Sequence, residues 1–280
     1  MEDLYPGATS SGAVNLYAVG SILVFTANDG VHGAELWRSD GTALGTRMLQ
    51  DIDPGPGTSE PKQFQPVGPN LYFSAKDSVH GRELWALPKT ALLSTFADVP
   101  ADFWAWPFVE ALAGAGLTNG CAPDHFCPGN PVSRAEIAIF LTRGTRGADF
   151  VPSAATGTLF EDVPADYWAA SWIEQFAQDG FTGGCNAAPP LYCPGRSLTR
   201  AEMAIFLLRA KYGSAYTPPP ATGTVFTDVP AGFWAGAWIE QLAAEGITLG
   251  CAPGLYCPED PVNRAQVAAF LARTFNLPLP

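Results

Sequence analysis

One four-residue phrase containing an arginine occurs three times in this chain of 280 residues. It reads Ser-Arg-Ala-Glu at 133–136, Thr-Arg-Ala-Glu at 199–202 and Asn-Arg-Ala-Gln at 263–266. The arginines are Arg134, Arg200 and Arg264. A planar guanidinium beside the free N–H groups of a helix start can hold a carboxylate through paired hydrogen bonds. The phrase therefore predicts an anion-binding position, with an ion pair to an acidic residue of a neighbouring repeat as the alternative.

The first and fourth residues of the phrase predict a structural role. Ser or Thr followed three residues later by Glu is a capping box, in which two side chains satisfy backbone N–H groups at a helix start. Asn and Gln can make the same hydrogen bonds. The predicted cap residues are Ser133, Glu136, Thr199, Glu202, Asn263 and Gln266. Capping does not explain the arginine, because the helix dipole slightly disfavours a cation at that end.

The cysteines predict disulfides rather than a metal site. All six fall into three local pairs, which are Cys121 with Cys127, Cys185 with Cys193, and Cys251 with Cys257. The gaps do not match C-x2-C, and the single histidine nearby is His125. Disulfides are typical of an oxidising compartment, yet the first residues show no signal-peptide pattern. We therefore expect a piece of a longer exported precursor.

The phrase lies inside a longer repeat that occurs three times after residue 94. Each copy opens with F-x-D-V-P, and the tryptophans that follow are 64 and then 66 residues apart. The apolar periodicity predicts helix, loop, helix, with Gly- and Pro-rich linkers between copies. The predicted repeats are 94–146, 158–212 and 224–275. One copy cannot bury both of its helices, so we expect an all-α spindle of three repeats with pseudo-threefold symmetry.

Residues 1–90 have a different pattern, with short β-type runs separated by turns. The sequence Glu-Leu-Trp occurs at 35–37 and again at 83–85, which are 48 residues apart. This period and the strand pattern predict partial propeller-like blades at the end of a truncated array. His32 and His80 recur in the turns and are expected to be structural. The predicted fold class is therefore mixed, with an N-terminal β segment before the helical spindle.

The helical repeats resemble S-layer homology domains, and residues 1–90 resemble the ELWxSDGT-type repeats of bacterial surface proteins. The resemblance rests on the F-x-D-V-P opening, the W-A pair, the G-x-T-x-G turn and the T-R-A-E helix start. It implies a non-catalytic anchoring module that binds cell-wall polysaccharide, often bearing pyruvate ketals, in grooves between repeats. Besides the three arginines, it implies ligand contacts by Asp98, Asp162, Asp228, Trp104, Trp168 and Trp234. Turn-forming aspartates and core tryptophans are the structural alternatives.

Composition and motifs exclude several other classes of protein. The net charge is −12 without a Lys/Arg-rich run, so we expect no nucleic-acid partner. No apolar stretch is long enough to predict membrane insertion. No catalytic, cofactor or metal motif is present, so we expect no enzyme and no cofactor. The predicted location is extracellular, at the cell surface, with wall polysaccharide or peptidoglycan as partner.

Two alternatives to a simple anchor remain. The chain could be the anchoring tail of an exported enzyme, or a self-associating surface-layer or adhesion protein. Under the anchor hypothesis, Arg200→Ala should weaken wall binding with little loss of stability.

Overall fold

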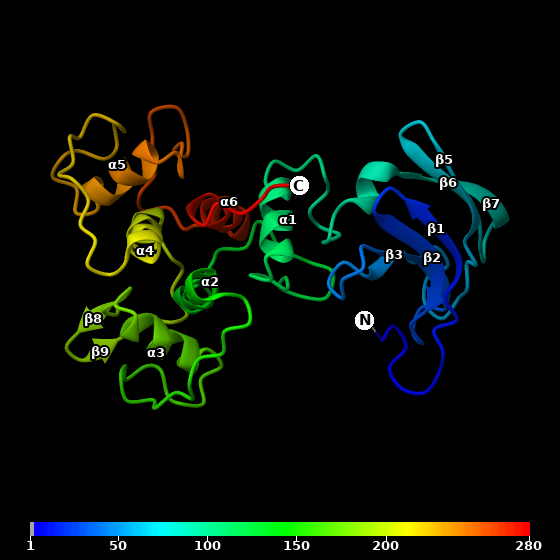
Figure 1. Cartoon of the computed structure of the whole chain (residues 1–280), viewed down its shortest axis with the longest axis horizontal. Coiled ribbons are helices and arrows are strands. Elements are labelled where there is room, and N and C mark those ends of the chain that lie inside the picture. The colour runs from blue at the N-terminus through cyan, green and yellow to red at the C-terminus, as the bar shows by residue number, and fades with distance from the viewer. Residues whose placement is uncertain (1–2) are drawn as a thin grey trace. The chain divides into compact units, whose positions relative to one another are not determined.

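The computed structural model describes residues 3–280, which divide into two compact units. The first unit contains the residues up to Trp106 together with Asn119–Phe126, and the second contains Pro107–Thr118 and Cys127–Pro280. The long strands lie in the first unit, and most of the helical residues lie in the second (Figure 1).

The first unit contains two antiparallel sheets. The first sheet has the order β1 (Val14–Val19), β2 (Ile22–Asn28), β3 (Ala34–Ser39) and β4 (Arg47–Gln50). The second has the order β5 (Lys62–Val67), β6 (Asn70–Asp77) and β7 (Gly81–Pro88), followed by the short 3-10 helix η1 (Lys89–Leu92). Branched and aromatic residues suit these strands because they pack well on a pleated surface.

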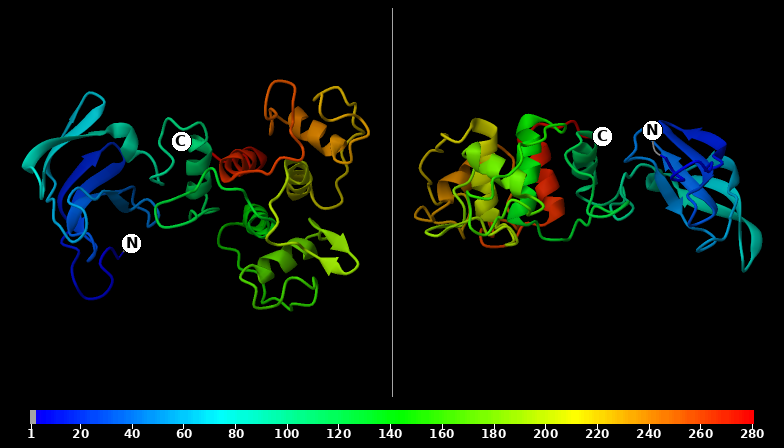
Figure 2. Two further views of the ribbon diagram at one scale, coloured as in Figure 1. Left: turned by 180° about the vertical axis from the view of Figure 1, so that it is seen from behind. Right: turned by 90° about the horizontal axis from the view of Figure 1, so that it is seen from below.

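The 48-residue sequence period is also a period of strand pairing. Val14 pairs with Thr26 in the first sheet, and Lys62 pairs with Ser74 in the second. In each sheet the register is irregular after this pair, and pairing resumes three residues further along the first strand. The two sheets share one apolar core, to which each contributes its central strand. They therefore lie against each other within this unit (Figure 2).

Six α-helices follow in pairs, one pair for each predicted repeat. They are α1 (Trp106–Gly114), α2 (Arg134–Arg146), α3 (Ala170–Gln178), α4 (Arg200–Tyr212), α5 (Gly236–Ala244) and α6 (Arg264–Thr274). In the second unit α2, α4 and α6 lie side by side (Figures 1 and 2), α3 packs against α2, and α5 packs against α4. The first helix of a repeat thus packs against the second helix of the preceding repeat. Among residues 3–280, each helix is too short or too polar to cross a lipid bilayer.

The prediction of an all-α spindle is wrong. The second repeat contains a small strand pair, β8 (Asn186–Ala187) with β9 (Pro190–Leu191). Isolated β-bridges also join different repeats, at Pro131 with Asn263, Ser133 with Ser197, and Thr199 with Pro261. Hydrophobic periodicity identifies amphipathic helices but does not show how loops pair. The backbone groups of these partly buried loops still require partners, and they find them in strand-like contacts between repeats.

Candidate functional site

The three phrases lie at the starts of α2, α4 and α6, and each forms a capping box. The backbone N–H of Glu136 donates to Ser133 Oγ at 3.2 Å, and that of Ser133 donates to Glu136 Oε2 at 2.8 Å. Thr199 with Glu202, and Asn263 with Gln266, are bonded in the same way. The arginine is consequently the first residue of each helix, where its side chain is free to reach another repeat.

The residues just before the phrases bond to one another in a closed ring. The N–H of Val132 donates to the carbonyl of Val262, that of Val262 to Leu198, and that of Leu198 to Val132, each at 2.9 Å. The phrases extend this contact, as where Arg134 N donates to Arg196 O at 3.0 Å. The helix starts therefore tie the three repeats together through backbone hydrogen bonds.

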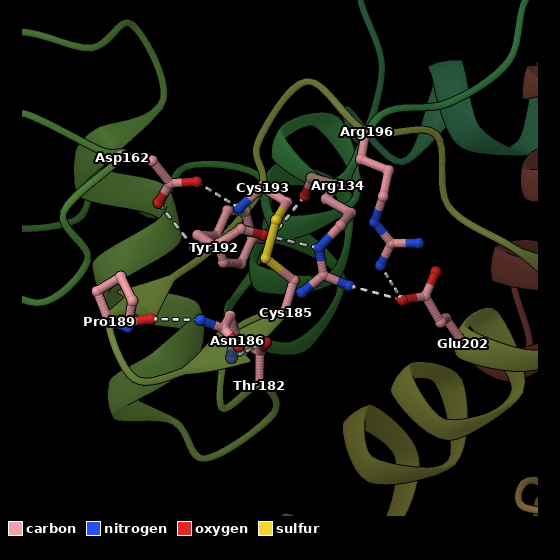
Figure 3. The surroundings of a disulfide bond; sticks show 11 residues. Arg134, Asp162, Thr182, Cys185, Asn186, Pro189, Tyr192, Cys193, Arg196 and Glu202 are labelled. Carbon is pink, nitrogen blue, oxygen red and sulfur yellow. Dashed lines mark hydrogen bonds and ion pairs between the residues drawn. A yellow bond between two sulfur atoms is a disulfide. The ribbon is translucent and has the colours of Figure 1, made fainter.

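Arg134 is buried in this junction, with 2% of its surface exposed. Its Nε donates to the carbonyl of Tyr192 at 2.9 Å, and its Nη1 donates to Glu202 Oε1 at 3.1 Å (Figure 3). The Tyr192 hydroxyl donates back to the Arg134 carbonyl at 2.7 Å, and its ring centroid lies 4.9 Å from the guanidinium carbon. Burial lowers the pKa of Arg134, and the nearby Tyr192 and Glu202 oppose that shift. The side chain links two repeats through one aromatic and one acidic residue.

Arg200 makes the equivalent contacts with the third repeat. It is 2% exposed, and its Nε donates to the carbonyl of Tyr256 at 2.7 Å. The Tyr256 hydroxyl donates to the Arg200 carbonyl at 2.8 Å, and the guanidinium carbon lies 4.7 Å from the ring centroid. Burial lowers the pKa of Arg200 as well.

The ion pairs of the phrase arginines run in one direction around the ring of repeats. Arg264 Nη1 lies 3.4 Å from Glu136 Oε1. Arg134 pairs with the glutamate of the second phrase, so each arginine pairs with the phrase that comes next. By this order the partner of Arg200 would be residue 266, which is a glutamine and carries no carboxylate. Among residues 3–280, Arg200 accordingly makes no ion pair, although its neighbours in the ring do.

The aspartates of the F-x-D-V-P opening hold the loops that receive the arginines. Asp162 Oδ1 accepts from Tyr192 N at 2.8 Å, and Oδ2 accepts from Cys193 N at 2.7 Å (Figure 3). Cys193 has φ +58°, a conformation that costs a non-glycine residue energy. The carboxylate therefore fixes an unfavourable turn and aims the Tyr192 carbonyl at Arg134. The acid that pairs with the arginine is a capping glutamate and not this aspartate.

The other two aspartates occupy equivalent positions. Asp228 accepts from the N–H groups of Tyr256 and Cys257 at 2.9 and 2.7 Å. In the first unit, Asp98 Oδ1 accepts from Phe126 N at 2.8 Å. All three carboxylates thus position a loop by binding its backbone.

Asp162→Ala is expected to destabilise the fold by about 2 kcal/mol, because two N–H groups lose a charged acceptor. Thermal unfolding of the variant against the parent protein checks this. Asp166→Ala, four residues away on an exposed turn, is the matched control and should change little. Equal effects of the two substitutions would contradict the role of Asp162.

Disulfides brace the same loops. Cys185 bonds to Cys193 and Cys251 bonds to Cys257, with 6.0 Å between the Cα atoms in each case. Cys121 and Cys127 have the same spacing as the second of these pairs, and no cysteine among residues 3–280 is free. The cysteine that follows the tyrosine is also the residue held by the aspartate. The disulfide and the carboxylate therefore stabilise one turn.

The tryptophans that follow the opening motif lie on the surface and not in the core. Trp104, Trp168 and Trp234 are 55%, 62% and 59% exposed. Each ring contacts the aromatic ring just before it, with centroids 5.8 Å apart. An exposed indole at an equivalent position in every repeat presents a flat apolar face to solvent.

Two glutamates that sequence reasoning did not assign to a site hold the linkers. Glu174 Oε1 accepts from Gly157 N at 2.7 Å, and Oε2 accepts from Thr156 N at 2.9 Å. Glu240 holds the next linker in the same way. Gly157 has φ +68°, and a Cβ atom there would lie 2.5 Å from Ala165 N, so this turn requires glycine. The repeated Ala-Thr-Gly-Thr sequence before the second and third openings was the signal for this contact.

Glu174→Gln is expected to lower stability by about 1 kcal/mol at neutral pH and by much less in acid. Burial raises the pKa of Glu174, but hydrogen bonds from Thr156 and Gly157 outweigh it and leave the pKa below its ordinary value. The stabilisation is therefore complete above the unfolded pKa of about 4.3 and is lost as the pH falls through the folded value. Melting temperatures of both proteins between neutral and acidic pH check this, and a gap that stays constant would contradict it.

Comparison with known proteins finds a domain family that the first repeat matches. Residues 95–138 match the S-layer homology domain. This span begins just before Asp98, includes Trp104 and ends in the first turns of α2.

Longer stretches of this chain are similar to parts of larger proteins. The Surface-layer 125 kDa protein of Lysinibacillus sphaericus is 28% identical over 182 residues, which cover 60% of this chain and 14% of that protein. A Cellulosome-anchoring protein of Acetivibrio thermocellus is 28% identical over 165 residues, covering 58% and 36%. An Endoglucanase of Bacillus sp. strain KSM-635 is 28% identical over 116 residues, covering 41% and 11%. The chain thus spans 36% or less of the length of these three relatives.

Proposed function

We propose that this chain anchors an exported protein to the bacterial cell surface by binding a cell-wall polysaccharide. The S-layer homology match at 95–138 and the similarity to surface-layer and cellulosome-anchoring proteins support this role. Residues 158–212 and 224–275 have the same opening, tryptophan and helix start. We therefore propose that all three repeats, beginning with 94–146, are S-layer homology domains, and that residues 1–90 are ELWxSDGT-type repeats.

The observation that carries the proposal is the exposure of three equivalent tryptophans. Water contact with an indole ring is unfavourable, and exposed aromatic side chains are enriched at binding sites. A pyranose ring has an apolar face of C–H groups that can stack on such a ring. We propose Trp104, Trp168 and Trp234 as sugar contacts.

The phrase arginines and the opening aspartates have a supporting role in this proposal. Each arginine is at most 5% exposed and bonds to protein, and each aspartate binds backbone N–H groups. They position the loops that contain the cysteine pairs. Direct ligand contact by these residues stays a prediction, and it would require a ligand carboxylate to enter the buried junction.

The test is co-sedimentation of the oxidised chain with purified cell-wall sacculi, before and after removal of their attached polysaccharide. We expect binding to intact sacculi and loss of binding after removal. Retention on stripped sacculi would assign the site to peptidoglycan. An absence of binding to both preparations would overturn the anchoring proposal.

The similarity to an endoglucanase supports a second candidate, in which the same anchor serves an exported enzyme. A hydrolase assay on the product of the longer open reading frame distinguishes this candidate from a purely structural anchor. The similarity to surface-layer proteins supports self-association instead. Sedimentation velocity at high protein concentration tests it, and a persistent monomer would contradict it.

A further inference from the structure

Repeats 1 and 2 meet at the first junction of the ring, repeats 2 and 3 at the second, and repeats 3 and 1 at the third. The first junction has a full set of contacts. The buried Arg134 pairs with Glu202 at 3.1 Å, and the Tyr192 hydroxyl donates to the Arg134 carbonyl at 2.7 Å. The linker 147–157 spans this junction, and Glu174 accepts hydrogen bonds from the linker backbone. Each of the other two junctions lacks part of this set.

The second junction lacks the carboxylate, and the third lacks the tyrosine hydroxyl. Gln266 has the place of the glutamate in the second junction, and its Oε1 already accepts from Asn263 N at 3.2 Å. Its other polar atom is a donor, so it cannot pair with the Arg200 guanidinium. In the third junction Phe126 replaces the tyrosine, and the ion pair of Arg264 is longer, at 3.4 Å. Both junctions with a missing contact are those of the third repeat.

The chain also ties the third repeat less firmly than the second. Within residues 3–280 a linker spans the first and second junctions, and none spans the third. Ser171 Oγ accepts from the backbone of the first linker at 3.2 Å, and Ala237 replaces this serine beside the second linker. The second linker, 213–223, contains three consecutive prolines at 218–220. A proline run is extended and stiff, so this linker acts as a spacer between the second and third repeats.

We propose that the third repeat is exchanged between two copies of this chain. Each closed ring then consists of repeats 1 and 2 of one molecule and repeat 3 of the other. Exchange opens the second and third junctions within each molecule and forms both again between the two molecules. The closed molecule and the exchanged dimer therefore have the same contacts, and the partner that fits them is a second copy of this chain. The exchange does not depend on the proposed wall ligand.

The test uses an ion pair between the second and third repeats. Lys211 on α4 pairs with Glu245 after α5 at 2.7 Å, and both side chains are partly exposed. Lys211→Glu in one sample of the full chain and Glu245→Lys in another each bring two like charges together in the closed molecule. A mixed exchanged dimer has opposite charges at both sites again. We expect at least about tenfold more dimer in the mixture than in either sample alone, measured by sedimentation velocity.

The matched control uses the equivalent ion pair between the first and second repeats, which is Arg146 with Asp179. This pair stays within one chain when only the third repeat is exchanged. A mixture of Arg146→Asp and Asp179→Arg should therefore form no more dimer than its components. Equal dimer formation in the two mixtures would overturn the assignment to the third repeat. A first mixture with no added dimer would overturn the exchange itself.

A second measurement does not depend on the folding of charge-reversed variants. Two samples of the natural chain, labelled with different dyes, are mixed at high concentration, and two-colour co-sedimentation follows the mixed dimers with time. Gln266→Glu supplies a carboxylate for Arg200 and should slow mixing about tenfold, because the second junction must open during exchange. The final amount of dimer should stay the same, since the added contact forms in both states. Natural chains that never mix, or an unchanged rate in the variant, would contradict the proposal.

Discussion

Arg134→Ala is expected to lower the free energy of unfolding of the helical repeats by about 3 kcal/mol. The substitution removes a buried guanidinium and leaves the Tyr192 carbonyl without its donor and Glu202 without its buried partner. It also removes the cation that lies against the rings of Tyr192 and Phe206. Denaturant unfolding followed by circular dichroism measures this loss.

The chain offers a matched control for this prediction. Arg196 also donates to Glu202, but its side chain is exposed, and Arg196→Ala should cost less than about 1 kcal/mol. Arg200→Ala should fall between the two, because Arg200 is buried but has no acidic partner within residues 3–280. Equal and small losses for Arg134→Ala and Arg196→Ala would contradict a structural role for the buried arginine.

The burial of Arg200 also changes the effect expected for its substitution. From its sequence position alone, Arg200→Ala should impair wall binding with little loss of stability. The structure places the side chain under Tyr256 with 2% exposure, so a loss of stability must be measured before any loss of binding is interpreted.

The local features of the helical repeats could be predicted from the sequence, because their interactions span only a few residues. A capping box needs only the residue before the helix and the third residue within it, so Ser133 with Glu136 is readable directly. The 48-residue period of the strands could be predicted for the same reason, since each hairpin forms from neighbouring residues.

The partners of the buried arginine could not be predicted in this way. Glu202 lies 68 residues from Arg134, and Tyr192 lies 58 residues away. Both meet the arginine only after different repeats have packed together. The helical pattern likewise gave no indication of the strand-like pairing between loops, which made the all-α prediction wrong.

The exposure of the three tryptophans could not be predicted from the sequence either. Trp168 stands two residues before α3, beside the apolar stripe that buries Ile173, and composition alone favours the core for such a residue. The backbone turn that precedes the helix directs the ring outward instead. Three-dimensional position therefore separates these surface rings from the core, and sequence periodicity does not.

Replacement of both Trp168 and Trp234 by alanine is expected to weaken binding to intact sacculi by about a hundredfold. This prediction rests on the proposed function. Removal of a central aromatic contact commonly costs about 1.4 kcal/mol or more, which is a tenfold loss for each ring. The melting temperature should change little, because both rings are mostly exposed. Sedimentation binding curves on intact sacculi, measured beside thermal unfolding, give both quantities.

Tyr212→Ala is the matched control, since Tyr212 is also an exposed aromatic residue of the second repeat but is not part of the tryptophan series. It should leave binding unchanged. If the double tryptophan variant binds as well as the parent protein while the parent binds intact sacculi, the indole rings are not sugar contacts. The junction of Arg134 and Arg200 is then the next site to test, and a ligand that enters it predicts a loss of binding in Arg200→Ala that exceeds what its loss of stability explains.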